Sequence, residues 1–189
     1  MRSVWESIAD RYAAYQLAMP GSPTFICQAE LCDAHCCRAF SVNLGEAEVE
    51  RMQRANGLQP LHFLESEDGV PLKLPLAQPY LLKRAENRCA QLGPWLSCGQ
   101  YDGRPNACRL YPHFVLFIDP ASLRPVHAEI DGMLASFAAA TGVAELAPGL
   151  YVPLLLRHVE CPGFTGPPMT SIEWCKLFDD TFRLQYPAS

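Results

Sequence analysis

The sequence predicts an α+β fold: one small domain over residues 1–189 with short strands, a few helices and long irregular loops. Three observations predict this class. Some segments repeat apolar residues at helical spacing, whereas others are short apolar runs bounded by proline and glycine. Residues 87–112 show neither period, although they contain three cysteines. Such a stretch holds its shape only if something else fixes it, and we expect a cysteine-ligated metal centre to do so.

Two helices are expected in the first third of the chain. Residues 3–18 carry an apolar stripe at helical spacing, and Ser3 and Glu6 have the spacing of a capping box. The stripe consists of Val4, Ile8, Tyr12 and Tyr15, with Met19 as a further candidate. Residues 46–56 begin with three glutamates, where the helix dipole favours acid, and Gly57 can end this helix. The charges of this second helix need only a solvated face to explain them.

Strands are expected in the shorter apolar segments. The strongest of these is 113–119, and residues 125–130 are its expected partner across a turn at 120–124. Residues 150–158 are also strand-like, although Pro153 would fit poorly in a central strand because it has no N–H to donate. Weaker candidates are residues 39–44, 70–74 and 80–83.

Two more helices are expected toward the C-terminus. Residues 131–141 can form one, which Gly142 would end. The last helix begins at Thr170 or Ser171 and runs to about Tyr186. Its apolar face consists of Ile172, Cys175, Phe178 and Phe182. Cys175 has no other cysteine nearby in the sequence, so we interpret it as a core residue and not as a metal ligand.

Composition and charge argue against several classes of function. With 20 acidic and 15 basic residues the net charge is -5, so we expect no basic surface for nucleic acid or an anionic membrane. No apolar run approaches the roughly eighteen residues of a membrane span, and Glu6 and Asp10 interrupt any N-terminal signal. No glycine-rich nucleotide motif or serine nucleophile elbow is present. We therefore expect a cytoplasmic protein whose reduced cysteines bind metal or take part in catalysis.

Eight of the nine cysteines are expected to bind metal. Four of them fall within the eleven residues 27–37, and two of those four are adjacent. Thiolates this close repel one another unless a cation lies between them, and the usual solutions are zinc or an iron–sulfur cluster. The sequence leaves open the choice between these cofactors and the division of the ligands between sites. The expected ligands are Cys27, Cys32, Cys36, Cys37, Cys89, Cys98, Cys108 and Cys161.

Other side chains near the cysteines are candidates for supporting roles. Four thiolates around one zinc leave a net negative charge, which nearby cations can offset. Arg104 and Arg109 lie close to Cys108 in the sequence and are candidates for this role; the alternative is that they are ordinary surface arginines. His35 lies inside the first cysteine stretch and is a candidate ligand or hydrogen-bond donor, the alternative being a histidine with no part in the site.

Together these motifs resemble the bacterial CxxCxxCC family of zinc- or iron-chelating proteins, also called YkgJ-type cysteine cluster proteins. The resemblance covers about residues 25–165, and its most specific piece is Arg104-Pro105-x-x-Cys108-Arg109-x-Tyr111-Pro112. The other motifs that carry it are Phe25-Ile26-Cys27, Cys32 with Cys36-Cys37, Arg88-Cys89, Cys98-Gly99-Gln100-Tyr101 and Cys161-Pro162-Gly163. The resemblance implies a metal site and leaves its biological role open.

The first motif departs from the usual pattern of this family. Successive cysteines are normally separated by two residues, whereas here the gaps are four (Cys27 to Cys32) and three (Cys32 to Cys36). That spacing is similar to the one in flagellin lysine N-methylases, which are considerably longer proteins with a related cysteine region. The resemblance therefore implies the metal-binding region more directly than it implies methyl transfer.

Three functions remain in view from the sequence. The first is a metal-binding protein whose eight cysteines hold zinc or an iron–sulfur cluster that organises the fold. The second is a protein-modifying metalloenzyme similar to a lysine N-methylase, against which the short chain and the missing nucleotide motif count. The third is a metal carrier that passes its ion to a partner. A protein partner or protein substrate fits each of them, and the sequence does not identify it.

Overall fold

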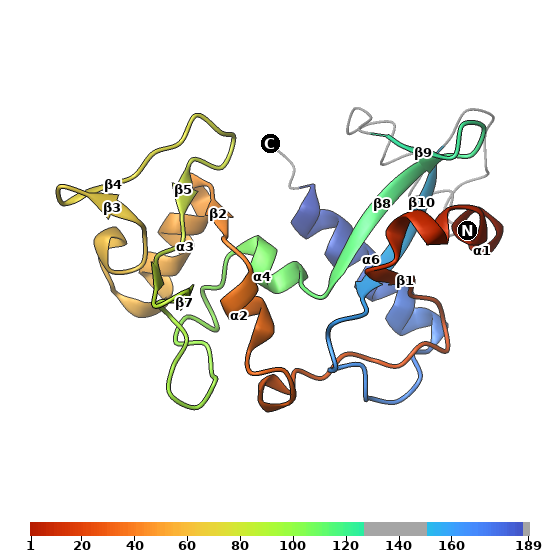
Figure 1. The fold of residues 1–189 in the computed structure, drawn as a ribbon, viewed down its shortest axis with the longest axis horizontal. Helices are drawn as coiled ribbons and strands as arrows, with labels where there is room; N and C mark the ends of the chain where they lie inside the picture. Colours follow the sequence, from red (N-terminus) through yellow and green to blue (C-terminus); the bar gives the residue numbers. More distant parts are fainter. Residues whose placement is uncertain (127–150, 187–189) are drawn as a thin grey trace. The chain divides into compact units, whose positions relative to one another are not determined.

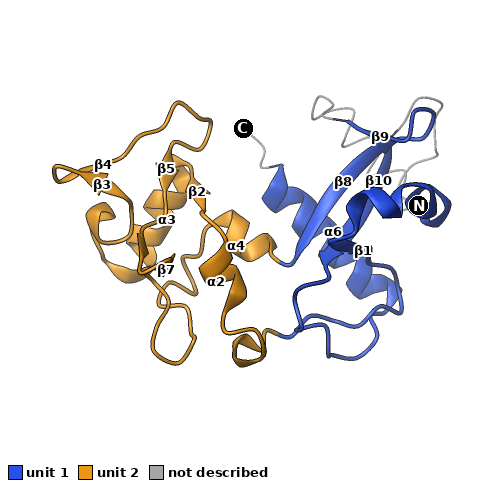
Figure 2. Cartoon of the chain, in the orientation of Figure 1, with its two compact units in different colours: residues 1–26, 112–189 blue, residues 27–111 orange. Residues whose placement is uncertain are grey.

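The computed structural model describes residues 1–126 and 151–186 (Figure 1). Two compact units make up the chain (Figure 2). Met1–Ile26 and Pro112–Ser189 form one, which we call the sheet unit, and Cys27–Tyr111 form the other, which we call the cysteine unit. Helices and short antiparallel sheets occur side by side along the chain, so the predicted α+β class is confirmed. The expectation of one domain over residues 1–189 stays a prediction.

A four-stranded antiparallel sheet forms the centre of the sheet unit, with the order β1-β10-β8-β9. The strands are β1 (Tyr15–Leu17), β8 (His113–Asp119), β9 (Arg124–Pro125) and β10 (Val152–His158). The predicted strand at 113–119 is confirmed, and Pro125 pairs with Ile118 as the expected partner segment begins. The rest of that segment, 127–130, lies outside the described residues, as does the helix expected at 131–141.

Pro153 lies inside β10, a strand with neighbours on both sides, which corrects the expectation that it would fit poorly there. The N–H of Ala18 donates to the oxygen of Leu155 over 2.8 Å, so the polar main-chain groups of β10 at 153, 155 and 157 face the β1 side. β1 pairs only with residues 156–158. The nitrogen of Pro153 therefore faces the space beyond the end of β1, where no strand formed by the described residues requires a donor.

The N-terminal segment differs from the single helix expected over 3–18. Helix α1 (Arg2–Ile8) is followed by a 3-10 turn, η1 (Ala9–Tyr12), and then by strand β1. The prediction of a helix was wrong beyond Tyr12, and the N-cap is Met1, with no side-chain cap from Ser3. Tyr15 packs its ring against Phe114 and His158, with ring centroids 4.6 and 4.4 Å apart. Sheet pairing and this aromatic contact outweigh the local helical pattern.

The predicted last helix is confirmed as α6 (Ser171–Gln185), which packs on the sheet and begins with a complete capping box between Thr170 and Glu173. Its buried residues Trp174, Phe178 and Phe182 join the core formed with Val115, Phe117, Leu155 and Met169. Ile172, expected on this face, is 83% exposed, because Trp174 takes the inward position in the first turn. Cys175 is half-buried and packs against the same core, as the sequence predicted.

The cysteine unit consists of short elements joined by long loops. Its best-formed element is α3 (Glu46–Asn56), whose predicted bounds are confirmed and which ends at Gly57 with φ of 69°. A small core of Leu44, Val49, Met52, Phe63, Leu64 and Leu82 packs on one face of this helix. Glu48 is also buried, so the interpretation of the α3 charges as a wholly solvated face was wrong.

Three two-stranded ladders and several single turns complete the cysteine unit. The predicted strands at 39–44, 70–74 and 80–83 occur only as two-residue pieces, because α2 and loop segments take the rest. The remaining elements are η2 (Ala29–Leu31), α2 (His35–Ala39), β2 (Asn43–Leu44), η3 (Pro60–His62), β3 (Ser66–Glu67), β4 (Val70–Pro71), β5 (Tyr80–Leu81), β6 (Arg84–Ala85), β7 (Arg88–Cys89) and α4 (Asn106–Leu110). None of the helices in the described ranges is long and apolar enough to cross a membrane.

Candidate metal centre

The first cysteine stretch folds back on itself through two left-handed residues. Asp33 and Ala34 have φ of 49° and 51°, which L-residues rarely adopt, and α2 begins directly after them. Arg38 secures this bend, since its Nε donates to the Asp33 main-chain oxygen over 2.7 Å and its Nη2 to the carboxylate over 3.0 Å. The bend brings Cys32 and Cys36 near Cys27, whose pKa is raised by burial and by the charges of those two thiols.

A hairpin and the loop after it carry the next two cysteines. Cys89 lies in β7 opposite Arg84 of β6. In the loop that follows, the main chain of Cys98 pairs with that of Leu92 in an isolated antiparallel β-bridge. The N–H of Gly99 donates to the oxygen of Gln91 over 2.8 Å, which closes this loop at its base. The chain thus returns Cys98 to the neighbourhood of Cys89, and the charge of Cys98 contributes to the raised pKa of Cys89, after the larger effect of burial.

The third segment is the single helical turn α4, which carries Cys108. Burial raises the pKa of the Cys108 thiol to about 12, and the charges of three other cysteines, Cys89, Cys98 and Cys36, contribute. Those three cysteines come from the two segments described above, so all three segments meet. We call the seven cysteines of this unit the thiol cluster: Cys27, Cys32, Cys36, Cys37, Cys89, Cys98 and Cys108.

The tandem thiols Cys36 and Cys37 share a hydrogen bond. The Cys37 S–H donates to the Cys36 sulfur, and this bond, assisted by main-chain N–H groups, lowers the pKa of Cys36 to about 6 although burial opposes the shift. The same bond raises the pKa of Cys37, because removing its proton would leave two adjacent negative sulfurs. The shared hydrogen bond therefore moves the two pKa values apart, so that Cys36 loses its proton more readily than Cys37.

The donor set of the thiol cluster fits a thiophilic cation. Sulfur ligands favour zinc and iron–sulfur clusters, and a bound cation favours the thiolate form of these thiols, which burial in the cluster opposes. Their protons would leave when metal binds. Among residues 1–126 and 151–186, however, no three His, Cys, Asp or Glu side chains already form a group arranged to hold a metal ion. The cysteines of the cluster are thus near one another, but their sulfurs are not arranged around a single metal position.

Cys161 and the supporting residues occupy different places. Cys161 lies in the sheet unit, half-buried in the turn after β10, where its N–H donates to the His158 oxygen. Arg104 lowers the pKa of Cys108 and of Cys27 by its charge, against the larger opposing effects. Arg109 is exposed, and its charge acts on Arg51. His35, at the start of α2, lies beside Cys36 and helps to lower the pKa of that thiol.

Arg84 joins two cysteine-bearing segments, although no pattern in the sequence marks it as part of the site. Its guanidinium donates to the main-chain oxygens of Arg38 and Phe40, at the end of α2, and to that of Asn87 in the hairpin. The hairpin of Cys89 is thereby tied to the helix of Cys36 and Cys37. Unlike Arg38, Arg88 and Arg109, Arg84 does not border a cysteine in the sequence, so nothing singles it out before the fold is known.

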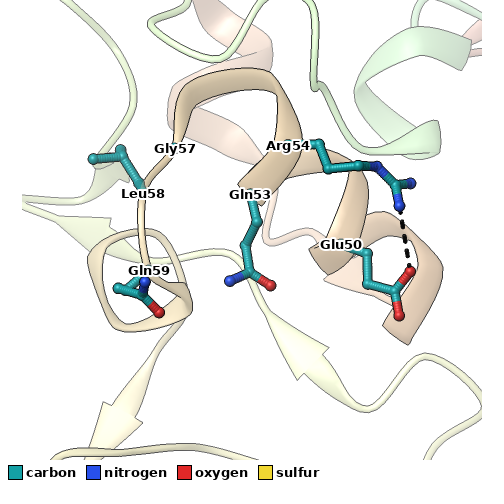
Figure 3. A pocket seen from close by; sticks show the side chains of 6 residues that line it. All are labelled: Glu50, Gln53, Arg54, Gly57, Leu58 and Gln59. Carbon is teal, nitrogen blue, oxygen red and sulfur yellow. Dashed lines mark ion pairs between the residues drawn. The ribbon is translucent and has the colours of Figure 1, made fainter.

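A hollow of about 350 Å³ lies at the end of α3 (Figure 3). It is lined by Glu50, Gln53, Arg54, Gly57, Leu58 and Gln59, and Glu50 and Arg54 form an exposed ion pair across one side of it. Its lining lacks sulfur or imidazole donors, so the hollow has no part in the metal chemistry proposed below.

One family model matches the chain. It is the CxxCxxCC model, described as "Putative zinc- or iron-chelating domain", and it covers residues 26–131, which is more than half of the chain. The matched stretch is shorter than the one inferred from the motifs, and it contains the whole thiol cluster but neither Cys161 nor Cys175. Neither the curated proteins nor the solved structures that were searched include a match to this sequence.

Proposed function

Because the chain belongs to the CxxCxxCC family of zinc- or iron-chelating domains, we propose that it is a metal-binding protein whose thiol cluster holds zinc or an iron–sulfur cluster. One observation carries the proposal: three separate segments of the cysteine unit bring their cysteines close enough for the charges of these thiols to act on one another, beside the larger effect of burial on their pKa, and Arg84 ties two of the segments together. Gathering so many ionisable sulfurs is unfavourable without a cation. A bound cation supplies the compensating interaction.

The seven thiols of the cluster are the proposed ligands, and Cys161 is proposed as the eighth on the strength of its sequence motif. As structural zinc ligands, thiolates form closed sites of four, so the set suffices for one or two such sites. Zinc bound here would stabilise the fold, and an iron–sulfur cluster would add electron transfer. Arg104 is the arginine best placed to offset the negative charge, since its effect on Cys27 and Cys108 is favourable to their thiolates.

The test is a measurement of metal and acid-labile sulfide on protein purified without air, together with a visible absorption spectrum. Iron with sulfide and a brown colour would identify an iron–sulfur protein. A colourless protein with stoichiometric zinc would identify a zinc protein. Protein that contains neither metal, and that binds neither zinc nor iron when these are supplied under reducing conditions, would contradict the proposal.

A second candidate, the metal carrier, is favoured by the exposure of Cys27. Cys27 is the exposed member of the thiol cluster, whereas the other six are half-buried. An exposed thiolate is the natural first contact for a competing ligand on a partner protein. A carrier would surrender its metal to a strong chelator within minutes, and Cys27→Ser would slow that transfer. Metal that resists the chelator for hours would exclude this role.

A further inference from the structure

Glu48 of α3 is a buried carboxylate that connects two helices. Only 6% of the residue is exposed. One oxygen, Oε2, accepts a hydrogen bond from the N–H of Gly45 over 2.9 Å, which completes the N-terminus of α3. The other, Oε1, accepts from the N–H of Asn106 over 2.6 Å, at the first residue of α4. A single side chain thus fixes the start of α4 relative to α3.

Arg51, one turn further along α3, holds the same segment by other contacts. Its Nη2 donates to the main-chain oxygen of Arg104 over 2.9 Å and to the side-chain oxygen of Asn106 over 2.8 Å. The same nitrogen lies 3.7 Å from Oε1 of Glu48, so the two charges compensate each other in a partly buried place. Removing either side chain would leave part-buried hydrogen-bond partners unsatisfied.

Gly103 brings the segment into direct contact with the surface of α3. A Cβ at this position would lie 2.8 Å from the Cβ of Ala55 and 3.1 Å from the Cα of Met52, closer than side-chain carbons approach. The absence of a side chain at Gly103 is therefore required for the loop to reach the helix. This close approach brings residues 104–106 within hydrogen-bonding distance of the Glu48 and Arg51 side chains.

Cys108 takes its position from this anchor. It is the third residue of α4, which has only five residues, and a helix of that length does not hold its own conformation. We propose that Glu48 and Arg51 are positioning residues for Cys108: they fix residues 104–106 on α3 and so hold the Cys108 sulfur toward the rest of the thiol cluster. The proposal rests on the proposed function, because it treats Cys108 as a metal ligand.

The experiment compares Glu48→Ala and Arg51→Ala with Glu50→Ala and Arg54→Ala. The second pair is a matched control on the same helix, because Glu50 and Arg54 also form an ion pair but are well exposed (Figure 3). We expect zinc affinity to fall about ten- to a hundredfold in the first two variants, as for other residues that orient metal ligands, and to stay unchanged in the controls. Zinc is supplied to metal-free, reduced protein, and a chromophoric chelator reports the affinity.

A second measurement separates positioning from general loss of structure. The alkylation rate of each cysteine in metal-free protein is read from its peptide by mass spectrometry. We expect Glu48→Ala and Arg51→Ala to accelerate alkylation of Cys108 several-fold, with Cys89 and Cys98 little changed. Equal acceleration at all three cysteines would indicate loss of the whole unit and overturn the proposal, as would unchanged rates with unchanged zinc affinity. If the unaltered protein binds neither zinc nor iron, the proposed function fails, but the alkylation rates still decide this inference.

Gly103→Ala provides an independent route to the same displacement. Its added Cβ meets the Cβ of Ala55, so Cys108 alkylation is expected to rise as in Glu48→Ala although both charges are present. Adding Ala55→Gly removes the nearer obstacle and is expected to restore slow alkylation in part. Ala55→Gly alone is the control and should behave as the unaltered protein. If it does, and Cys108 in the double variant reacts no more slowly than in Gly103→Ala, the result would count against the contact between residues 103–106 and α3.

Discussion

The N–H of Ile26 donates a hydrogen bond to the main-chain oxygen of Gly163 over 2.7 Å. A Cβ at Gly163 would lie 2.6 Å from the Ile26 oxygen and 2.6 Å from the Phe25 ring. The last residues of the sheet unit before Cys27 are thus held against the loop that follows Cys161, within one unit. This explains why glycine is needed at the end of the Cys161-Pro162-Gly163 motif.

Gly163→Ala is therefore expected to destabilise the sheet unit by about 1–3 kcal/mol, because the methyl group overpacks a main-chain contact that cannot move cheaply. Urea unfolding followed by circular dichroism would measure the loss. Gly99→Ala is the control, since a Cβ there would lie 3.4 Å from the nearest atom, the Gln91 oxygen, which is an ordinary contact. Equal stability of Gly163→Ala and the unaltered protein would contradict the packing described above.

Replacement of Arg84 is expected to weaken metal binding. Arg84→Ala removes the bonds from β6 to the carbonyl groups at the end of α2, and we expect zinc affinity to fall about ten- to a hundredfold. Arg84→Lys should bind zinc nearly as weakly as Arg84→Ala, because an ammonium group cannot span three carbonyl oxygens as the guanidinium does. Chelator competition would measure both affinities. Arg88→Ala in the next strand, where the side chain pairs with exposed Glu86, is expected to retain normal affinity.

Serine at different cysteines should separate ligands from core residues. Cys36→Ser and Cys108→Ser are expected to lose metal, because a hydroxyl group is a poor zinc ligand and both sulfurs lie in the thiol cluster. Cys175→Ser should keep its metal and lose about 1 kcal/mol of stability, since Cys175 packs on the core of the sheet unit. Metal analysis and thermal unfolding of the three variants would test this. Equal metal content in all three would refute the assignment.

His113 is expected to make the stability of the sheet unit depend on pH. It is buried between aromatic rings, and burial together with the charge of Arg157 lowers its pKa to about 4. Between pH 6.5 and pH 4 the unfolded chain binds a proton that the folded chain does not, so stability falls as the pH is lowered through this range. The loss attributable to His113 is at most about 3 kcal/mol, and below pH 4 it grows no further.

Urea unfolding at pH 7 and pH 4.5 would measure this dependence. His113→Phe should lose less stability than the unaltered protein on acidification, because the carboxyl groups that also titrate are the same in both. His62→Gln, at an exposed position, serves as the control and should behave as the unaltered protein. An unchanged pH dependence in His113→Phe would show that this histidine is not the source.

The elements that could be predicted from the sequence are those whose own residues carry the signal. The strand at His113–Asp119 is a short apolar run between Pro112 and Pro120, and α3 has acid at its start and glycine at its end. The N-terminal segment could not be predicted past Tyr12, because an apolar residue at Tyr15 fits both the apolar face of a helix and an edge strand. Only its pairing with His158 decides between them. Likewise, the sequence could not show that β10 tolerates Pro153, because that depends on where β1 ends.

The same distinction holds for the candidate site. The sequence predicts eight cysteine ligands because the number and spacing of the cysteines are unusual. Seven of the eight lie in the cysteine unit, and their binding of metal stays a prediction. Glu48, Arg51 and Arg84 could not be found in that way, since each acts through main-chain groups more than 40 residues distant. The sequence holds many similar charged residues on exposed faces. Burial and partners distinguish these three, and both are properties of the tertiary structure.

The discontinuous chain of the sheet unit has a further thermodynamic consequence. The chain leaves this unit after Ile26 and returns at Pro112, so the whole cysteine unit lies within the loop that must close before β1 can pair with β10. Closing a disordered loop of that length costs conformational entropy, whereas a folded insert already holds its ends near one distance. A cation that orders residues 27–111 would thus lower the entropic cost of assembling the sheet. We therefore expect bound metal to speed the folding of the four-stranded sheet, although none of its strands contains a proposed ligand.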